Sequence, residues 1–337
     1  MALQRDVERL ARSRRHPGVV LATGGLTGPV ALASAGKLTG ETPFYAASAT
    51  KLLITALMVM SDAPPLDTPF REILTGPDTE GLHRKSGRDR TGEITLRHLL
   101  QHTSGLPDYF EAASSKSGLL AELLTGADRA WTFAEAMEIA RRLGPIGAPG
   151  DLRRAHYSDT NFQLLGKVIE QVHGKPLAEV LNARLFAPLG LSQTWLASDP
   201  ADLRPVALRY KEQALPIPRA MASFQADGGL VTTALEGLQI LRAIFGGVLF
   251  DASRLSSMYD WRPWQFPLSY GTGMMRFTLP RLMTGFRDMP ELIGHSGLSG
   301  AVLFHAPRTG LCIAGTVNQI DRPGTVFRLM ASAALSG

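Results

Sequence analysis

The order of apolar and polar residues divides the chain into a strand-rich start, a helical middle and a strand-rich end. At the start, apolar residues at helical spacing predict an amphipathic helix over 3–15. Two apolar runs on either side of a glycine-rich turn then predict a hairpin with strands at 18–23 and 30–35. The chain therefore begins with two antiparallel strands that need a larger sheet to join.

The middle of the chain carries apolar residues at helical spacing in several separate segments. Proline and glycine residues stand between these segments, as expected where helices end. Thr95 precedes one of the segments and is predicted to cap it. The predicted helices cover 48–60, a segment that begins near 94, and 132–143, 159–173 and 177–186.

After about residue 215 the pattern returns to strands. A helix over 234–246 is followed by apolar runs at 270–278, 300–306 and 310–317, and a Pro-Arg-Thr-Gly turn separates the last two. We therefore expect an α+β fold in which one antiparallel sheet is assembled from both chain ends. The sheet domain would contain residues 1–60 and 216–337, and a mostly helical inserted domain would contain residues 61–215.

Composition narrows the class of protein. The chain has 337 residues, of which 45% are hydrophobic and 19% charged, and this excludes disorder, collagen and coiled coil. The net charge of +5 comes without basic and aromatic residues interleaved, so we expect no nucleic-acid partner. Cys312 is the single cysteine and lies in an apolar run, which predicts a core thiol. We expect no metal and no cofactor.

The N-terminal region also bears on location. No run of about 18 apolar residues occurs, so no membrane span is predicted. Two arginines before an apolar stretch imitate an export signal, but Gly24, Gly25, Gly28 and Pro29 interrupt that stretch. We therefore expect a cytoplasmic protein, with export as the alternative. The sequence leaves the oligomeric state open.

The first candidate for chemistry is Ser48-Ala49-Thr50-Lys51 at a predicted helix start. Positions three apart share a helix face, so the Lys51 amine would lie one turn beyond the Ser48 hydroxyl. Serine is a weak nucleophile unless a neighbouring group takes its proton, and a lysine at this offset can assist. A four-residue pattern of this kind also occurs by chance, and Ser48 would then only cap the helix.

Two further segments complete a possible site. Tyr157-Ser158-Asp159 precedes a helix, and the Tyr157 phenol could exchange protons with a serine. His295-Ser296-Gly297 precedes Leu298, and glycine there permits a ligand close to the backbone. A strand edge at this point offers N–H groups to a developing oxyanion.

The three segments, in this order, resemble the penicillin-recognising serine hydrolases. The branch of class C β-lactamases, D-alanyl-D-alanine peptidases and family VIII esterases carries S-x-x-K, Y-x-N and K-T-G or H-x-G. The resemblance extends over about residues 16–320 and includes ITLRHLLQHTSGLP at 94–107, YSDTNFQLLG at 157–166, FAPLGL at 186–191 and GGLVTT at 228–233. It implies a β-lactamase-like fold.

The resemblance also implies roles. Ser48 would attack a carbonyl and become acylated, while Lys51 and Tyr157 share the proton transfers and Tyr157 activates water for deacylation. The backbone N–H groups of Ser48 and Leu298 would form the oxyanion hole. Asp159, His295, Ser296 and Gly297 would contact the substrate.

Two residues depart from the family pattern. Asp159 replaces the usual asparagine, and a carboxylate beside Lys51 favours the ammonium form, so we expect Tyr157 to be the general base. Asp159 could equally cap the helix. His295 replaces the usual lysine and is mostly neutral at pH 7, which weakens recognition of a carboxylate unless Arg276 or Arg308 substitutes.

Some residues remain outside this constellation. His98 and His102 lie four apart but lack a third ligand, so we expect His102 to fix its loop rather than to bind a metal. Four aromatic residues precede a strand and form either part of the core or a wall of an acyl pocket. They are Trp261, Trp264, Phe266 and Tyr270.

The sequence therefore predicts a cofactor-free serine hydrolase that forms an acyl-enzyme, first of all a carboxylesterase on small esters. The alternatives are a D-amino-acid amidase or peptidase and a weak β-lactamase. A non-catalytic binding protein on the same scaffold is the alternative from another class. A class A β-lactamase is disfavoured because no matching glutamate loop follows Ser158-Asp159-Thr160. The expected partner is a small ester or amide, without nucleic acid or membrane.

Overall fold

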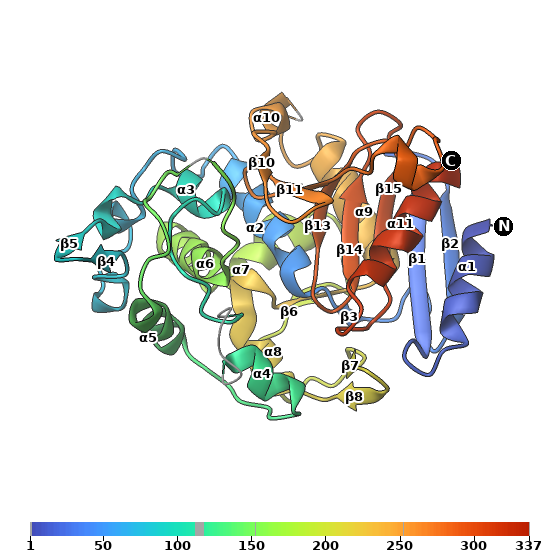
Figure 1. The fold of residues 1–337 in the computed structure, drawn as a ribbon, viewed down its shortest axis with the longest axis horizontal. Helices are drawn as coiled ribbons and strands as arrows, with labels where there is room; N and C mark the ends of the chain where they lie inside the picture. Colours follow the sequence, from blue (N-terminus) through green and yellow to red (C-terminus); the bar gives the residue numbers. More distant parts are fainter. Residues whose placement is uncertain (1, 112–117, 152, 252, 337) are drawn as a thin grey trace.

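The computed structural model describes residues 2–111, 118–151, 153–251 and 253–336. It has an α+β fold with a large antiparallel sheet at one side and a group of helices at the other (Figure 1). The eight strands lie in the order β10-β11-β12-β13-β14-β15-β1-β2. The predicted sheet of strands from both chain ends is therefore confirmed.

The first and the last strands of the chain meet in the sheet. β1 pairs with β2 on one side and with β15 on the other, with Val20 opposite Thr316. The strands are β1 (Gly18–Gly24), β2 (Val30–Gly36), β10 (Arg262–Pro263), β11 (Leu268–Tyr270), β12 (Met275–Phe277), β13 (Leu292–Ser296), β14 (Ala301–His305) and β15 (Cys312–Thr316).

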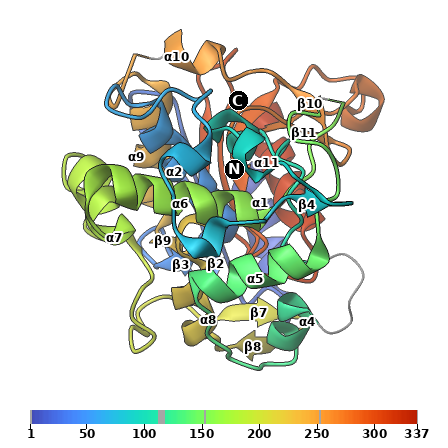
Figure 2. The same cartoon turned by 90° about the vertical axis from the view of Figure 1, so that its left-hand side faces the viewer.

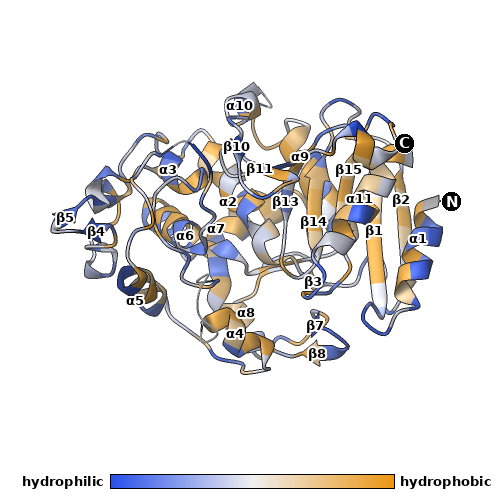
Figure 3. Cartoon of the chain, viewed as in Figure 1, coloured by the Kyte–Doolittle hydropathy of each residue, from blue (hydrophilic) through white to orange (hydrophobic). Residues whose placement is uncertain are grey.

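Helices cover both faces of the sheet. Val19 and Leu21 of β1 pack into a core with α1 (Ala2–Ala11) and α11 (Gly324–Ser336). Val20 and Ala22 point the other way, into the core that contains α9 (Ala234–Phe245). Because both of their faces are buried, the central strands β1, β14 and β15 are mainly apolar (Figure 3). This explains the continuous apolar runs of the sequence.

The helical side of the molecule surrounds α2 (Thr50–Val59), in which residues 50–58 are all buried (Figure 2). Thr95 caps α3 as predicted, because its hydroxyl accepts a hydrogen bond from the His98 N–H. The other helices are α3 (Leu96–Leu100), α4 (Leu119–Leu124), α5 (Phe133–Leu143), α6 (Asp159–His173), α7 (Leu177–Leu181), α8 (Pro218–Phe224) and α10 (Ser253–Ser256).

A small sheet connects the two sides of the molecule. β3 (Phe44–Tyr45) pairs with β9 (Leu230–Thr232), which also pairs with β6 (Trp195–Leu196). The Ala46 N–H extends this contact by donating to the Leu230 carbonyl at 2.8 Å. The segment that leads into Ser48 is therefore fixed beside the segment that follows Asp227.

Two hairpins complete the strands: β4 (Arg84–Lys85) with β5 (Arg88–Asp89), and β7 (Leu208–Tyr210) with β8 (Gln213–Leu215).

One element prediction is wrong. The apolar run 270–278 is not one strand, because the chain turns at Gly271-Thr272-Gly273 between β11 and β12. Gly273 has φ +73°, and a Cβ there would lie 2.1 Å from the Thr55 Oγ1 of α2. Only glycine permits this turn against α2. The helix α11 at the C-terminal end was not predicted from the sequence.

Two further predictions concern the whole chain. Among the residues that the structure describes, no helix combines the length and the apolar character needed to cross a bilayer. The cytoplasmic location stays a prediction. The division into a sheet domain (1–60 and 216–337) and an inserted helical domain (61–215) also stays a prediction.

The contact between α6 and the turn at residues 225–227 gives a test of the packing. A Cβ added to Gly166 would lie 2.5 Å from the Ala226 Cβ. We expect Gly166→Ala to lower the free energy of unfolding by about 1–2 kcal/mol, because overpacking outweighs the gain in helix propensity. Urea unfolding measures the change.

Gly76→Ala is the matched control. Nothing lies within 4 Å of a Cβ at Gly76, whose φ is −68°. Its unfolding free energy should stay within about 0.5 kcal/mol of that of the unmodified protein. An equally small effect at Gly166 would contradict the close packing of α6 on Ala226.

Candidate active site

Ser48 lies in a tight turn between β3 and α2. The turn is a 3₁₀ segment, Ala47–Ala49, and Ala47 has φ +46°. A left-handed alanine is unfavourable and persists only where its surroundings impose it. Thr50 supplies such a constraint, because its hydroxyl donates to the Ala47 carbonyl at 2.6 Å and accepts from the Leu230 N–H at 2.9 Å. The half-buried Ser48 side chain is therefore held at the N-terminal end of α2.

The Lys51 side chain is fully buried beside Ser48. Its Nζ lies 3.2 Å from the Ser48 Oγ, 2.6 Å from the Asp159 Oδ1 and 2.6 Å from the Asp227 carbonyl oxygen. Three acceptors match the three N–H groups of an ammonium. Burial is the largest single effect and lowers the pKa of Lys51, but the charge and contact of Asp159, together with the Asp227 charge, outweigh it and raise the pKa. Lys51 is therefore a cation at neutral pH, as expected.

Tyr157 faces the same point from the start of α6. Its ring centroid lies 5.1 Å from the Lys51 Nζ. Burial, and then the charge of Asp159, raise the pKa of Tyr157 well above 10. The free protein therefore holds Tyr157 as a phenol at neutral pH. The structure brings Ser48, Lys51 and Tyr157 together, whereas their catalytic roles stay a prediction.

His102 holds the segment that carries Tyr157. The His102 carbonyl accepts from the His156 N–H at 2.8 Å, and the His102 Nδ1 accepts from the Ser158 N–H at 3.1 Å. Because Nδ1 is an acceptor, the ring proton lies on Nε2. The ring packs against that of Tyr157 with centroids 4.4 Å apart. These contacts agree with a loop-fixing role, and no metal-binding cluster occurs in the described ranges.

Asp159 is the first residue of α6, and Ser158 occupies the N-cap position. The alternative that Asp159 caps this helix is therefore wrong. The carboxylate instead pairs with Lys51, and only 6% of its side chain is exposed. A buried carboxylate of this kind is stable only with a partner charge.

The residues after β13 approach Ser48 closely. A Cβ on Gly297 would lie 2.1 Å from the Ala46 carbonyl oxygen, so only glycine fits there. Leu298, the next residue, lines the same pocket as Ser48. Within the described residues, the Ser48 and Leu298 N–H groups donate to no turn, loop or side-chain acceptor. They are thus available to an oxyanion, although that role is still a prediction.

His295 lies on β13 and is fully buried. Its Nδ1 lies 2.8 Å from the Ser296 carbonyl oxygen and its Nε2 lies 3.0 Å from the Tyr270 hydroxyl. A carbonyl only accepts, so Nδ1 carries the proton and Nε2 accepts from Tyr270. Burial lowers the pKa of His295 to about 3, so the ring is neutral. The Ser296 hydroxyl donates to the Met275 sulfur at 3.4 Å. Direct contact of these side chains with substrate stays a prediction.

A mainly apolar pocket with a cavity volume of about 50 Å³ begins at Ser48. We call it the Ser48 pocket. Its apolar walls come from α4, α8 and the segments around 208–217 and 298. No arginine, lysine or histidine side chain is among its described lining residues. They are Ala47, Ser48, Phe110, Glu111, Leu120, Leu123, Leu124, Asp159, Leu208, Leu215, Ile217, Met221, Phe224, Asp227, Gly228, Leu298, Ser299 and Ile320.

The two arginines considered as substitutes for the family lysine bind elsewhere. Arg308 pairs with Asp288, and Arg276 donates to the Ser269 hydroxyl at 3.0 Å and lies over the Trp261 ring. Neither lines the Ser48 pocket. Among the residues that the structure describes, no Arg, Lys or His side chain therefore lines that pocket to bind a substrate carboxylate.

The aromatic cluster lies on the other side of Tyr157. Trp264 stacks on the Tyr157 ring at 5.0 Å and lines a second pocket with Tyr157 and Arg154. Tyr270 is fully buried against His102 and His295. The Ser48 pocket contains none of the four aromatic residues, so they do not form its wall.

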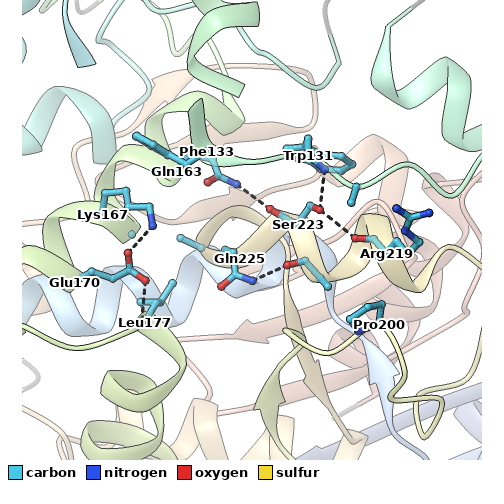
Figure 4. A pocket seen from close by; sticks show the side chains of 14 residues that line it. Trp131, Phe133, Gln163, Lys167, Glu170, Leu177, Pro200, Arg219, Ser223 and Gln225 are labelled. Carbon is cyan, nitrogen blue, oxygen red and sulfur yellow. Dashed lines mark hydrogen bonds and ion pairs between the residues drawn. The ribbon is translucent and has the colours of Figure 1, made fainter. Parts of the chain in front are cut away.

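Asp227 is a residue of the site that sequence reasoning missed. Its carbonyl holds Lys51, and its Oδ2 accepts from the Tyr109 hydroxyl at 2.8 Å and from the Gln163 Nε2 at 3.1 Å. Gln163 also lines a third pocket, on the side of Trp131 and Ser223 (Figure 4). The only available signal was position, because Asp227 directly precedes the family-like stretch that starts at Gly228.

Comparisons with known proteins agree with this geometry. Residues 3–334 match the family described as Beta-lactamase. The monacolin J acid methylbutanoyltransferase of Aspergillus terreus is 36% identical over 164 residues, which cover 45% of this chain and 37% of that protein. The D-aminopeptidase of Brucella anthropi is 35% identical over 111 residues, which cover 32% of this chain and 19% of that protein. The chain thus matches less than half the length of these relatives.

Solved structures share the fold over the whole chain. D-amino acid amidase from Ochrobactrum anthropi SV3 superimposes with a TM-score of 0.78 and 24% identity, covering 98% of this chain and 99% of that one. EstCE1, a hydrolase with promiscuous acyltransferase activity, has a TM-score of 0.81 and 18% identity, covering 100% of this chain and 98% of that one. At these identities the likeness establishes the fold alone.

Asp159→Asn tests the electrostatic control of Lys51. The substitution keeps the shape of the side chain but removes the charge that raises the pKa of Lys51, so that pKa falls. We expect the rising limb of log kcat/KM against pH, measured on a neutral ester, to move to lower pH by roughly one unit or more. An unmoved limb would show that Lys51 ionisation does not control the rate.

Proposed function

The chain belongs to the Beta-lactamase family, and from this premise we propose that it is a serine hydrolase, specifically a carboxylesterase that acts through an acyl-enzyme on Ser48. The ester substrate would place an apolar acyl group in the Ser48 pocket and its alcohol beside Tyr157. The observation that carries the proposal is the apolar lining of the Ser48 pocket, which lacks a cation among its described residues. An acyl group with a carboxylate would lose its hydration there without gaining a partner.

The proposed reaction has two halves. The Ser48 oxygen attacks the ester carbonyl, its proton passes to the Lys51–Tyr157 pair, and the oxyanion is stabilised by the Ser48 and Leu298 N–H groups. When the tetrahedral intermediate collapses, the carbon–oxygen bond of the ester breaks and the alcohol takes a proton from the same pair. Water then attacks the acyl-enzyme, with Tyr157 as the proton acceptor, and releases the acid.

The charge of the site decides which group can act as the base. Lys51 begins as an ammonium and Tyr157 begins as a phenol, because the pKa of each is raised. Either group accepts the Ser48 proton only from its deprotonated form. The Lys51 ammonium lies beside the Tyr157 ring, and its positive charge stabilises the phenolate form of Tyr157. This supports Tyr157 as the base.

The neutral His295 bears on the substrate class. A permanent cation at this position suits the carboxylate of a β-lactam or of a peptide C-terminus, whereas both His295 nitrogens bind within the protein. This supports esters, and then amides, over β-lactams. Phe110, Leu123 and Met221 would contact the acyl chain.

A substrate panel tests the proposal. We expect kcat/KM for p-nitrophenyl butyrate to exceed that for nitrocefin by at least about 100-fold, because the described lining of the Ser48 pocket offers a β-lactam carboxylate no cation. A fluorophosphonate should label the protein at Ser48. Ser48→Ala should abolish both hydrolysis and labelling. Ser13→Ala, which changes an exposed serine outside the site, serves as the control and should keep both. Faster turnover of nitrocefin would overturn the ester assignment, and an unlabelled Ser48 would favour a binding protein.

The raised pKa values also predict the pH dependence. The deprotonated forms of Lys51 and Tyr157 become more populated as pH rises, so log kcat/KM for a neutral ester should rise from about pH 7 to at least about pH 9. Rates of the Ser48→Ala variant supply the background of spontaneous hydrolysis. A plateau that begins below about pH 7 would contradict a base with a raised pKa.

A further inference from the structure

We propose that the Ser48 pocket contains a subsite for an ammonium group, formed by the Asp227 carboxyl and the Ser299 hydroxyl, and that the acyl group carries a primary amine close to its carbonyl. This rests on the proposed acyl-enzyme function and narrows its substrates to aminoacyl esters and amides. The subsite uses side chains that the proposed reaction leaves without a task.

The Asp227 carboxyl has one occupied and one free oxygen. Oδ2 accepts from Tyr109 and Gln163, whereas Oδ1 has no partner among the described residues. Asp227 is 1% exposed and lines the Ser48 pocket. An unpaired buried carboxylate oxygen is costly unless a ligand supplies the missing donor. The two bonds to Oδ2 fix the direction of the carboxyl, so the free oxygen is held in place.

Ser299 provides a second free group in the same pocket. It is 2% exposed, and its Oγ has no partner among the described residues. Its backbone carbonyl accepts from the Gln319 N–H at 2.9 Å, which fixes the turn after Leu298. The pocket therefore combines a carboxyl oxygen from the 225–227 turn with a hydroxyl from the strand end. Apart from these, its lining is mainly apolar.

The charge around the pocket favours a cation as the ligand. Glu111, Asp159 and Asp227 line it, and the buried Lys51 ammonium pairs with the carboxyl of Asp159 but reaches only the backbone carbonyl of Asp227. Burial, and then the Asp159 charge, raise the pKa of Asp227 well above its usual value, so an adjacent ammonium would favour the ionised carboxylate. A bound ammonium would balance this negative charge. A ligand hydroxyl would satisfy the hydrogen bonds but leave the charge unchanged.

The position of Asp227 places the amine near the reacting carbonyl. The Lys51 ammonium binds the Ser48 Oγ at 3.2 Å and the Asp227 carbonyl oxygen at 2.6 Å. The Lys51 Nζ therefore links the Ser48 hydroxyl to the Asp227 main chain through two hydrogen bonds. An acyl group bound to Ser48 would reach the Asp227 side chain with an amine on one of its first carbons, while its apolar remainder contacts Phe110, Leu123 and Phe224.

Binding to the Ser48→Ala variant tests the subsite without turnover. Calorimetry would compare 2-phenylethylammonium chloride with 2-phenylethanol at pH 7. We expect the amine to bind at least about 10-fold more tightly than the alcohol, because a charged hydrogen bond is lost with the alcohol. Adding Asp227→Asn should bring this ratio close to one. Adding Asp67→Asn, which removes a largely exposed carboxylate paired with Arg97, should leave the ratio unchanged.

Turnover provides the second test. The kcat/KM for phenylalanine methyl ester, in both enantiomers, would be divided by that for methyl 3-phenylpropanoate. We expect a ratio of at least about 10 for the better enantiomer, falling toward one in Asp227→Asn and also decreasing in Ser299→Ala. Circular dichroism would check that each variant is folded. Hydrolysis of the neutral ester at a ratio near one would overturn the ammonium subsite and leave the esterase proposal standing.

The remaining outcomes are also decisive. Equal binding of amine and alcohol by Ser48→Ala would overturn the subsite whether or not any ester is hydrolysed. Preferential binding of the amine without turnover of any ester would support the subsite and overturn the esterase proposal. If Asp227→Asn does not fold, Ser299→Ala and the comparison of amine with alcohol in Ser48→Ala still decide the matter.

Discussion

A lysine ammonium sealed inside the protein is the constraint around which this site is arranged. Lys51 has no exposed surface, and it makes two hydrogen bonds, to a serine hydroxyl and a backbone carbonyl, and one ion pair with a carboxylate. A buried charge with fewer partners would be too costly to keep. The three partners come from the turn before α2, from α6 and from the turn before β9. Each of these segments must therefore be in place before the ammonium is stable where it lies.

The packing around the site holds the segments that carry the partners of Lys51. The small sheet fixes the entry to Ser48, and the missing side chain of Gly166 lets α6 lie against Ala226, next to Asp227. His102 holds the start of α6 from the opposite side. The Asp159 charge that helps to keep Lys51 protonated also adds to the effect of burial in raising the pKa of Tyr157. The Asp159 carboxylate thus contributes both to holding Lys51 in place and to the proton affinity of the site.

Local spacing made part of the fold and of the candidate site predictable from the sequence. Ser48 and Lys51 share a helix face by their offset alone, and the first hairpin and α6 follow from periodicity and turn residues. Tyr157 could be joined to them only through the family resemblance, because no local rule brings residues 100 positions apart together. Asp227 was out of reach, since it holds Lys51 through a backbone carbonyl, which any residue type has. The turn in 270–278 depends on contact with Thr55 of α2.

The pairing of β1 with β15 has a consequence for how the protein is made. Val20 lies opposite Thr316, so the centre of the large sheet cannot close until nearly all of the chain has left the ribosome. Contacts of such long sequence separation form slowly, since the entropy of closing a long loop comes first. Until then the apolar hairpin has an unpaired edge, which is a surface prone to association. Chaperone protection of the nascent chain would matter most during this interval.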